Sequence, residues 1–118
     1  VFHSATTAET ATMAHYLAND AVAVIGTHNK VMTADSFLLN DTTAFISDNG
    51  RVGAKYSVGG FNPTEEIKKY MTGLPIRSQE GWNGGILNGV LVSVDLDNSK
   101  AVDIKPVTYE IEISRPEG

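Results

Sequence analysis

Two histidines stand where an apolar run gives way to polar residues. His3 follows Val1-Phe2 at the start of the chain, and His28 follows closely on the apolar run from Ala21 to Ile25. If both runs are parallel strands, their imidazoles meet at one edge of a sheet, where α/β proteins place ligands and metals. Neutral imidazole is the commonest protein ligand for transition metals, so the pair would supply half of a coordination sphere. The competing interpretation is that each histidine is simply hydrogen-bonded or faces solvent.

Other polar residues favour structural roles. His15 lies in the middle of an expected helix and is predicted to be a surface residue. Asp35 and Asp48 follow strands in turn-like segments and are read as turn formers. The glycine-rich run from Val58 to Phe61 matches neither the phosphate-loop motif nor the dinucleotide fingerprint. Spacing alone assembles no Ser-His-Asp arrangement.

The elements that position the histidines have clear local signals. Thr6 and Glu9 form a T-x-x-E capping box, which predicts a helix running to about Asn19. The short apolar run 21–25 is typical of a central parallel strand that is covered on both faces. A strand, a helix and a parallel strand imply a right-handed crossover. The helical period predicts a buried stripe of Met13, Ala14, Leu17 and Ala18.

The rest of the chain reads as short strands, a loop, a helix and a hairpin. We expect a loop over 27–36, then strands at 37–39 and 43–47 joined by a turn at Asn40-Asp41. The polar, glycine-rich stretch 48–62 is long enough to be a functional or a mobile loop.

After that stretch the local signals change twice. Pro63 suits the first turn of a helix over about 64–71, which Gly73 closes. Beyond Pro75 the apolar residues alternate, predicting a hairpin of strands 86–96 and 101–114.

Composition bounds the class of protein. A chain of 118 residues, 42% hydrophobic and 19% charged, suits a single globular domain spanning 1–118. A net charge of −5 argues against non-specific binding to nucleic acid or anionic membranes. With no cysteine there is neither a disulfide framework nor a thiolate metal site, which fits a reducing compartment. No apolar run approaches a membrane span, and the opening Val1 suggests a processed or truncated piece.

Several segments resemble the YmdB-like metallophosphoesterases. Residues 26–35, Gly-Thr-His-Asn-Lys-Val-Met-Thr-Ala-Asp, are similar to that family's G-T-H-T-H-V-Q-T-A-D signature. Residues 2–9 resemble its F-H-A-E-A-T-S-E block, and the spacing between the two blocks fits without a gap. Residues 43–50, 72–77 and 87–92 are similar to its T-A-Y-I-T-D-V-G, T-G-L-P-V-R and L-N-G-V-L-V segments.

The resemblance implies a fold and an activity. The expected fold is α/β, a sandwich of mixed β-sheets flanked by helices, of which this chain would be the C-terminal half. Members hydrolyse phosphodiesters, including 2′,3′-cyclic nucleotides, in the bacterial cytoplasm with two divalent metals, drawn from Mn, Fe, Mg or Zn. Such ions polarise a phosphoryl oxygen and activate water. His3 and His28 would be metal ligands, and Thr27 and Lys30 would meet the substrate phosphate.

Two substitutions depart from the family pattern. Lys30 stands where the family has the second histidine of its G-T-H-T-H block, so one metal site would survive while its partner loses a ligand. An ammonium has no lone pair for a cation, and Lys30 is either a point charge for a substrate phosphate or a solvated loop lysine. Ala5 stands where the family has a glutamate, and the loss of a supporting group weakens metal binding about ten- to a hundredfold.

The family's N-terminal half supplies further ligands, an Asp, an N-x-E-N block and a G-N-H block, which these 118 residues lack. We therefore expect a partner that carries this missing half, or a homo-oligomer that covers the exposed sheet. The two functional hypotheses are a metal-dependent phosphodiesterase, incomplete or impaired in this chain, and a non-catalytic homologue acting as a binding or scaffolding module.

Overall fold

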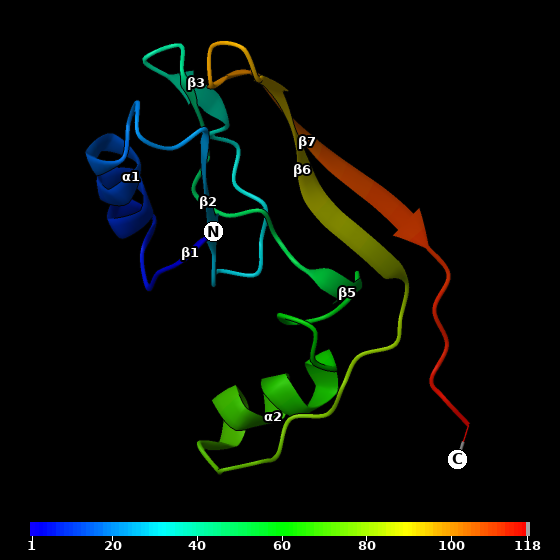
Figure 1. Cartoon of the computed structure of the whole chain (residues 1–118). Helices are drawn as coiled ribbons and strands as arrows, with labels where there is room; N and C mark the ends of the chain where they lie inside the picture. Colours follow the sequence, from blue (N-terminus) through cyan, green and yellow to red (C-terminus); the bar gives the residue numbers. More distant parts are fainter. Residues whose placement is uncertain (118) are drawn as a thin grey trace. The chain divides into compact units, whose positions relative to one another are not determined.

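The computed structural model describes residues 1–117, which form two helices and seven strands (Figure 1). In chain order they are β1 (Phe2–His3), α1 (Thr7–Tyr16), β2 (Ala23–Thr27), β3 (Phe37–Leu39), β4 (Thr43–Ile46), β5 (Val52–Ala54), α2 (Pro63–Thr72), β6 (Gly85–Asp95) and β7 (Lys100–Ile111). The strands make two sheets, of order β1-β2-β4-β3 and β5-β6-β7. The fold is therefore mixed α/β, as the sequence predicts.

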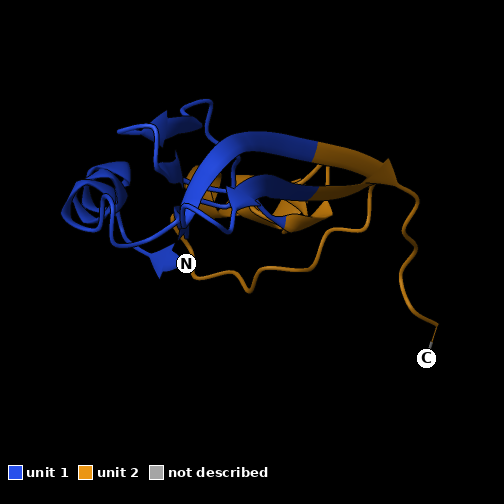
Figure 2. Cartoon of the chain, turned by 45° about the horizontal axis from the view of Figure 1, so that its top comes forward, with its two compact units in different colours: residues 1–51, 88–107 blue, residues 52–87, 108–118 orange. Residues whose placement is uncertain are grey.

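The chain divides into two compact units, coloured separately in Figure 2. Unit 1 comprises residues 1–51 and 88–107, and unit 2 comprises residues 52–87 and 108–118. The β6–β7 hairpin contributes to both, since its turn end belongs to unit 1 and its open end to unit 2. Both histidines of interest belong to unit 1.

Helix α1 begins at the predicted capping box. The Thr6 hydroxyl accepts a hydrogen bond from the Glu9 amide, and the Glu9 carboxylate accepts one from the Ala5 amide. The first bond satisfies an amide that the first helical turn leaves without a partner, and the second ties Glu9 to the residue before the N-cap. The helix ends at Tyr16, three residues before the predicted end, because Leu17 leaves the helical conformation as the C-cap.

The sheet of unit 1 has the predicted parallel start. Phe2 pairs with Gly26 and His3 with Thr27 in the β1–β2 register, and β2 in turn runs parallel to β4. Strand β3 closes the other side by pairing antiparallel to β4. The buried core lies between α1 and the sheet and consists of Ala14, Val24, Leu39 and Phe45. The predicted stripe of α1 packs against this core.

Strand β2 is covered less completely than its sequence predicts. Val24 and Gly26 are buried, whereas Ala23, Ile25 and Thr27 are only half-buried. Alternate residues of a strand point to opposite faces, and α1 covers only one face within the described part of unit 1. The uniformly apolar sequence could not reveal which face would lack a helix.

The stretch 48–62, expected to be a loop, contains strand β5. Val52 pairs with Leu87, and Ala54 with Gly85, in an antiparallel ladder. Helix α2 then follows as predicted, with Asn62 as the N-cap, Pro63 in the first turn and Gly73 as a left-handed C-cap. Unit 2 therefore holds a short ladder where the sequence indicated a loop, followed by the helix that the sequence predicted.

The predicted hairpin is present, with a turn over residues 96–99. Within unit 1, the Ala101 amide donates a hydrogen bond to the Thr42 carbonyl at 2.8 Å, and Ala101 is fully buried. Farther along β7, Tyr109 and Ile111 are exposed. Among residues 1–117, no helix is long and apolar enough to cross a membrane.

Candidate functional site

The two histidines lie together at the surface of unit 1. His3 is the last residue of β1, and His28 directly follows β2. His3 Nε2 and His28 Nδ1 are 3.2 Å apart, and the two rings stand at 90° with centroids 4.9 Å apart. The parallel register explains this proximity, since His3 pairs with Thr27, the neighbour of His28.

The spacing of the two nitrogens suits a shared cation. Two nitrogens that bind the same ion, each at about 2.0–2.1 Å, lie about 2.9–3.4 Å apart when the N–metal–N angle is octahedral or tetrahedral. The observed 3.2 Å falls inside this range. The distance is that of a hydrogen bond between the two rings, and it is also compatible with a shared cation, for which two ligands leave the coordination sphere incomplete.

Thr27 orients the first of these rings. Its hydroxyl lies 2.8 Å from His3 Nδ1, the nitrogen that faces away from His28. A histidine that binds a metal commonly donates its other ring N–H to a nearby oxygen, which fixes the tautomer and the ring plane. When His3 Nδ1 donates to Thr27, the lone pair of His3 is left on Nε2, facing His28.

Asp48 holds the loop that carries His28. Its buried carboxylate accepts hydrogen bonds from the Asn29 amide at 2.7 Å and from the Gly50 amide at 2.8 Å. The prediction that Asp48 forms a turn is therefore correct, but its complete burial gives it a second role. It fixes the backbone beside His28, whose φ of 127° is unusual for a residue with a side chain.

Asp35 fastens the far end of the same loop to β4. Its carboxylate accepts hydrogen bonds from the Ser47 amide at 3.1 Å, from the Ser47 hydroxyl and from the Thr33 hydroxyl at 2.6 Å. Burial alone would raise the pKa of Asp35, but the hydrogen bonds from Ser47 and Thr33 together lower it below its ordinary value of 3.8. A carboxylate that is hydrogen-bonded as an anion stabilises the folded state.

The lowered pKa of Asp35 predicts a pH-dependent contribution to stability. A group with a depressed pKa stabilises the fold above its unfolded pKa and loses this contribution as pH falls through the folded value. The free energies of unfolding of the protein and of Asp35→Asn, measured with urea, should therefore differ by a constant amount above about pH 5. The difference should shrink as pH falls below 3.8, toward the lowered pKa of Asp35. Because Asp35 is exposed, the difference should stay below about 1 kcal/mol. A difference that is constant from pH 6 to pH 3 would contradict this assignment.

Lys30 belongs to the same loop. Its backbone adopts a left-handed φ of 63°, and its carbonyl accepts a hydrogen bond from the Arg51 guanidinium at 2.8 Å. Among residues 1–117, no group of three or more His, Cys, Asp or Glu side chains is placed to hold a metal. The structure thus brings together two of the predicted site residues, His3 and His28, with Thr27 supporting one of them. Their role as ligands stays a prediction.

Solved structures identify the class of protein. The fold superimposes with a TM-score of 0.87 on a phosphatase from Mycoplasma pneumoniae, at 28% identity, covering 92% of this chain and 39% of that one. It also matches a hypothetical protein from Thermus thermophilus with a TM-score of 0.85, at 28% identity, covering 92% of this chain and 42% of the other. The fold is of the metallophosphoesterase type.

The sequence comparisons are more specific. Residues 1–107 match the family model described as YmdB-like protein, and the chain belongs to this family. It is 35% identical over 106 residues to a 2′,3′-cyclic-nucleotide 2′-phosphodiesterase of Bacillus subtilis, covering 90% of this chain and 40% of the relative. It is 29% identical to a putative phosphatase/phosphodiesterase of Mycoplasma pneumoniae, covering 90% of this chain and 38% of the relative. The chain thus spans about two-fifths of these relatives.

Proposed function

We propose that this chain is part of a metal-dependent phosphoesterase in which His3 and His28 hold a divalent cation. The observation that carries this proposal is the 3.2 Å separation of His3 Nε2 and His28 Nδ1. Membership of a family whose relatives are phosphodiesterases and phosphatases supports it. A bound divalent cation, from among Mn, Fe, Mg and Zn, supplies Lewis acidity toward a phosphoryl oxygen.

The residues of the chain have distinct tasks in this proposal. His3 and His28 present lone pairs to the cation, and the Thr27 hydroxyl keeps the His3 ring in the ligating tautomer. Asp48 holds the backbone next to His28 in place. Lys30 places a positive charge in the same loop, where it meets the phosphate of a bound substrate.

The substrate class follows from the relatives. One of them is named for hydrolysis of 2′,3′-cyclic nucleotides, so we propose phosphodiesters of this kind as substrates here. Two histidines cannot complete a metal centre, so further ligands come from outside these 118 residues, either from the remainder of a longer protein or from another chain. In this proposal residues 1–118 are the C-terminal portion of one metallophosphoesterase-like domain in the cytoplasm.

A second candidate function is a non-catalytic binding or scaffolding module. Lys30 and Ala5 favour this alternative, because the family has a ligand histidine at the first position and a glutamate at the second. Both replacements remove groups that would hold or support a cation. The fold would then persist without turnover.

Metal content and hydrolysis of bis-p-nitrophenyl phosphate distinguish the two candidates. If the proposal holds, the purified protein binds Mn²⁺ and shows turnover that chelation abolishes and that His28→Ala lowers at least about a hundredfold. Lys30→Gln should raise KM about tenfold with a smaller effect on kcat, as expected for a residue that binds the phosphate in ground and transition states alike. If the protein that includes the additional ligand residues neither binds a metal ion nor hydrolyses the substrate, the phosphoesterase proposal is wrong and the scaffolding function is supported.

A further inference from the structure

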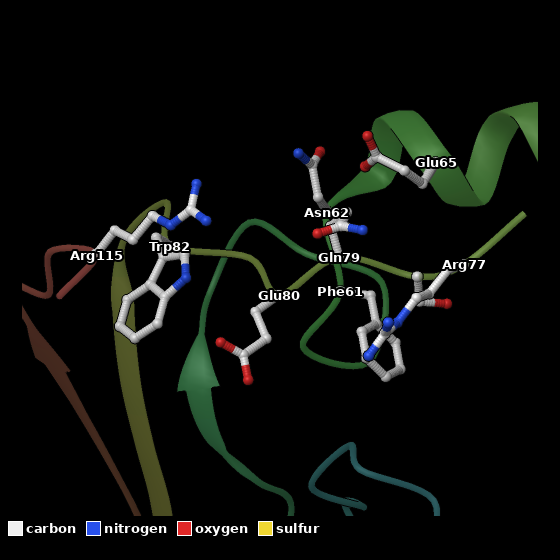
Figure 3. A pocket seen from close by; sticks show the side chains of 9 residues that line it. Phe61, Asn62, Glu65, Arg77, Gln79, Glu80, Trp82 and Arg115 are labelled. Atoms are coloured by element: carbon white, nitrogen blue, oxygen red, sulfur yellow. The ribbon is translucent and has the colours of Figure 1, made fainter. Parts of the chain in front are cut away.

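Unit 2 contains a cavity of about 700 Å³ that the proposed metal site does not use. Figure 3 shows the side chains that line it, which come from the start of α2, the segment 77–82 and the C-terminal segment. Its volume lies within the range of about 300–1,000 Å³ that is typical of small-molecule sites. It is therefore large enough to hold a mononucleotide.

The walls of this cavity are fixed by hydrogen bonds. The backbone amide of Asn62 donates to the backbone carbonyl of Gln79 at 2.7 Å, and the backbone amide of Gly81 donates to the backbone carbonyl of Gly60 at 2.8 Å. Lys69 of α2 forms a hydrogen bond with the Ser78 hydroxyl, which anchors the segment 77–82 to the helix. Lys69 also forms an ion pair with Glu66 on the same helix. A cavity with walls tied in this way is largely formed before any ligand binds.

The lining carries polar groups that the protein itself leaves unpaired. Glu65 Oε2 is buried and has no hydrogen-bond partner, although a carboxylate oxygen without a donor is costly to bury. Within residues 1–117, the side chains of Arg77 and Arg115 form no hydrogen bond or ion pair, and both line the cavity. The lining thus offers a carboxylate oxygen that lacks a donor and two exposed guanidinium groups that can bind an anion, together with the carboxylate of Glu80.

The aromatic lining adds a third requirement. Trp82 and Phe61 both line the cavity, and a planar ring stacks favourably on such side chains. A planar ring with N–H donors on one edge and a phosphate on the other side combines all three features. Guanine presents adjacent N1–H and N2–H donors to a carboxylate, whereas adenine does not, and arginines are the usual partners of phosphate.

We propose that the unit 2 cavity binds a guanine mononucleotide, with the base stacked on Trp82, its N–H edge on Glu65 and its phosphate between Arg77 and Arg115. The side-chain amides of Asn62 and Gln79 also line the cavity and can read the remaining groups of the base, Asn62 through its NH2 group because its Oδ1 accepts from the Thr64 amide. This site would be independent of the histidine pair and would need no metal.

The single tryptophan of the chain reports on this site directly. Titration with GMP in the presence of EDTA should quench Trp82 fluorescence, with AMP binding at least about tenfold more weakly and ribose 5-phosphate producing no quenching. Glu65→Gln should remove the preference for GMP over AMP. Arg77→Gln should weaken GMP about tenfold and leave guanosine almost unchanged.

Two controls separate the possible outcomes. Lys68→Gln, on an exposed position of α2 outside the cavity, should bind GMP normally, and so should the His3→Ala/His28→Ala variant, which tests the proposed phosphoesterase site. Circular dichroism of each variant checks that it folds. The proposal is wrong if about 1 mM GMP produces neither quenching nor heat by calorimetry. It is also wrong if Glu65→Gln and Arg77→Gln bind like the unmodified protein.

Discussion

Replacing His28 with alanine is expected to lower the affinity for Co²⁺ at least about a hundredfold, because it removes one of two converging nitrogen donors. Cobalt is a suitable probe since its visible absorption reports the ligands directly and needs no catalytic turnover. The loss should be similar for His3→Ala, because each imidazole supplies one of the two nitrogens that lie 3.2 Å apart. Titration followed by absorption spectroscopy measures both.

The chain offers matched controls for this experiment. His15 is its third histidine and lies exposed on α1, so His15→Ala should bind Co²⁺ like the unmodified protein. Thr27→Val removes the hydroxyl beside His3 Nδ1 but no ligand, and a loss of about tenfold is expected. Equal affinity of His28→Ala and the unmodified protein would show that the imidazoles are only a hydrogen-bonded surface pair.

Gly26→Ala is expected to destabilise unit 1 by more than about 3 kcal/mol. A β-carbon at Gly26 would lie 1.8 Å from the Ser47 carbonyl oxygen and 2.8 Å from Thr10 Cγ2. The nearest obstacle is backbone of a buried residue, which cannot move aside as a flexible side chain would. Because Gly26 immediately precedes Thr27 and His28, the proposed metal site should be lost with the fold. Urea unfolding followed by circular dichroism measures the effect.

Gly89→Ala provides the matched comparison within unit 1. A β-carbon there would meet only Val107 Cγ2 at 3.8 Å, an ordinary van der Waals contact. Its free energy of unfolding should therefore change by less than about 1 kcal/mol. If Gly26→Ala unfolds at the same urea concentration as Gly89→Ala, the close approach of β2 to Ser47 is not a constraint in solution.

Local sequence signals predicted the elements that carry the site. The capping box at Thr6 and Glu9 located the start of α1. Helix α2 begins at Pro63 and ends before Gly73, as the sequence predicted. The short apolar runs predicted the parallel pairing that brings His3 next to His28. These signals succeed because capping and strand propensity depend on residues close in the chain.

The parts that escaped prediction depend on distant residues. Strand β5 is only three residues long and includes Gly53, so its ladder with β6 left no periodic pattern to read. The complete burial of Asp48 could not be inferred from its place after a strand, since it depends on which amides the folded loop turns toward the carboxylate. The unit 2 cavity likewise joins side chains from separated segments.

The backbone at His28 has an implication for how this protein would diverge. A φ of 127° costs a residue with a β-carbon on the order of 1–3 kcal/mol, whereas glycine adopts it freely. Histidine at this position therefore costs the fold free energy that glycine would not cost. In a lineage that no longer used the imidazole, mutation of position 28 to glycine should be favoured, and the resulting protein should have a larger free energy of unfolding.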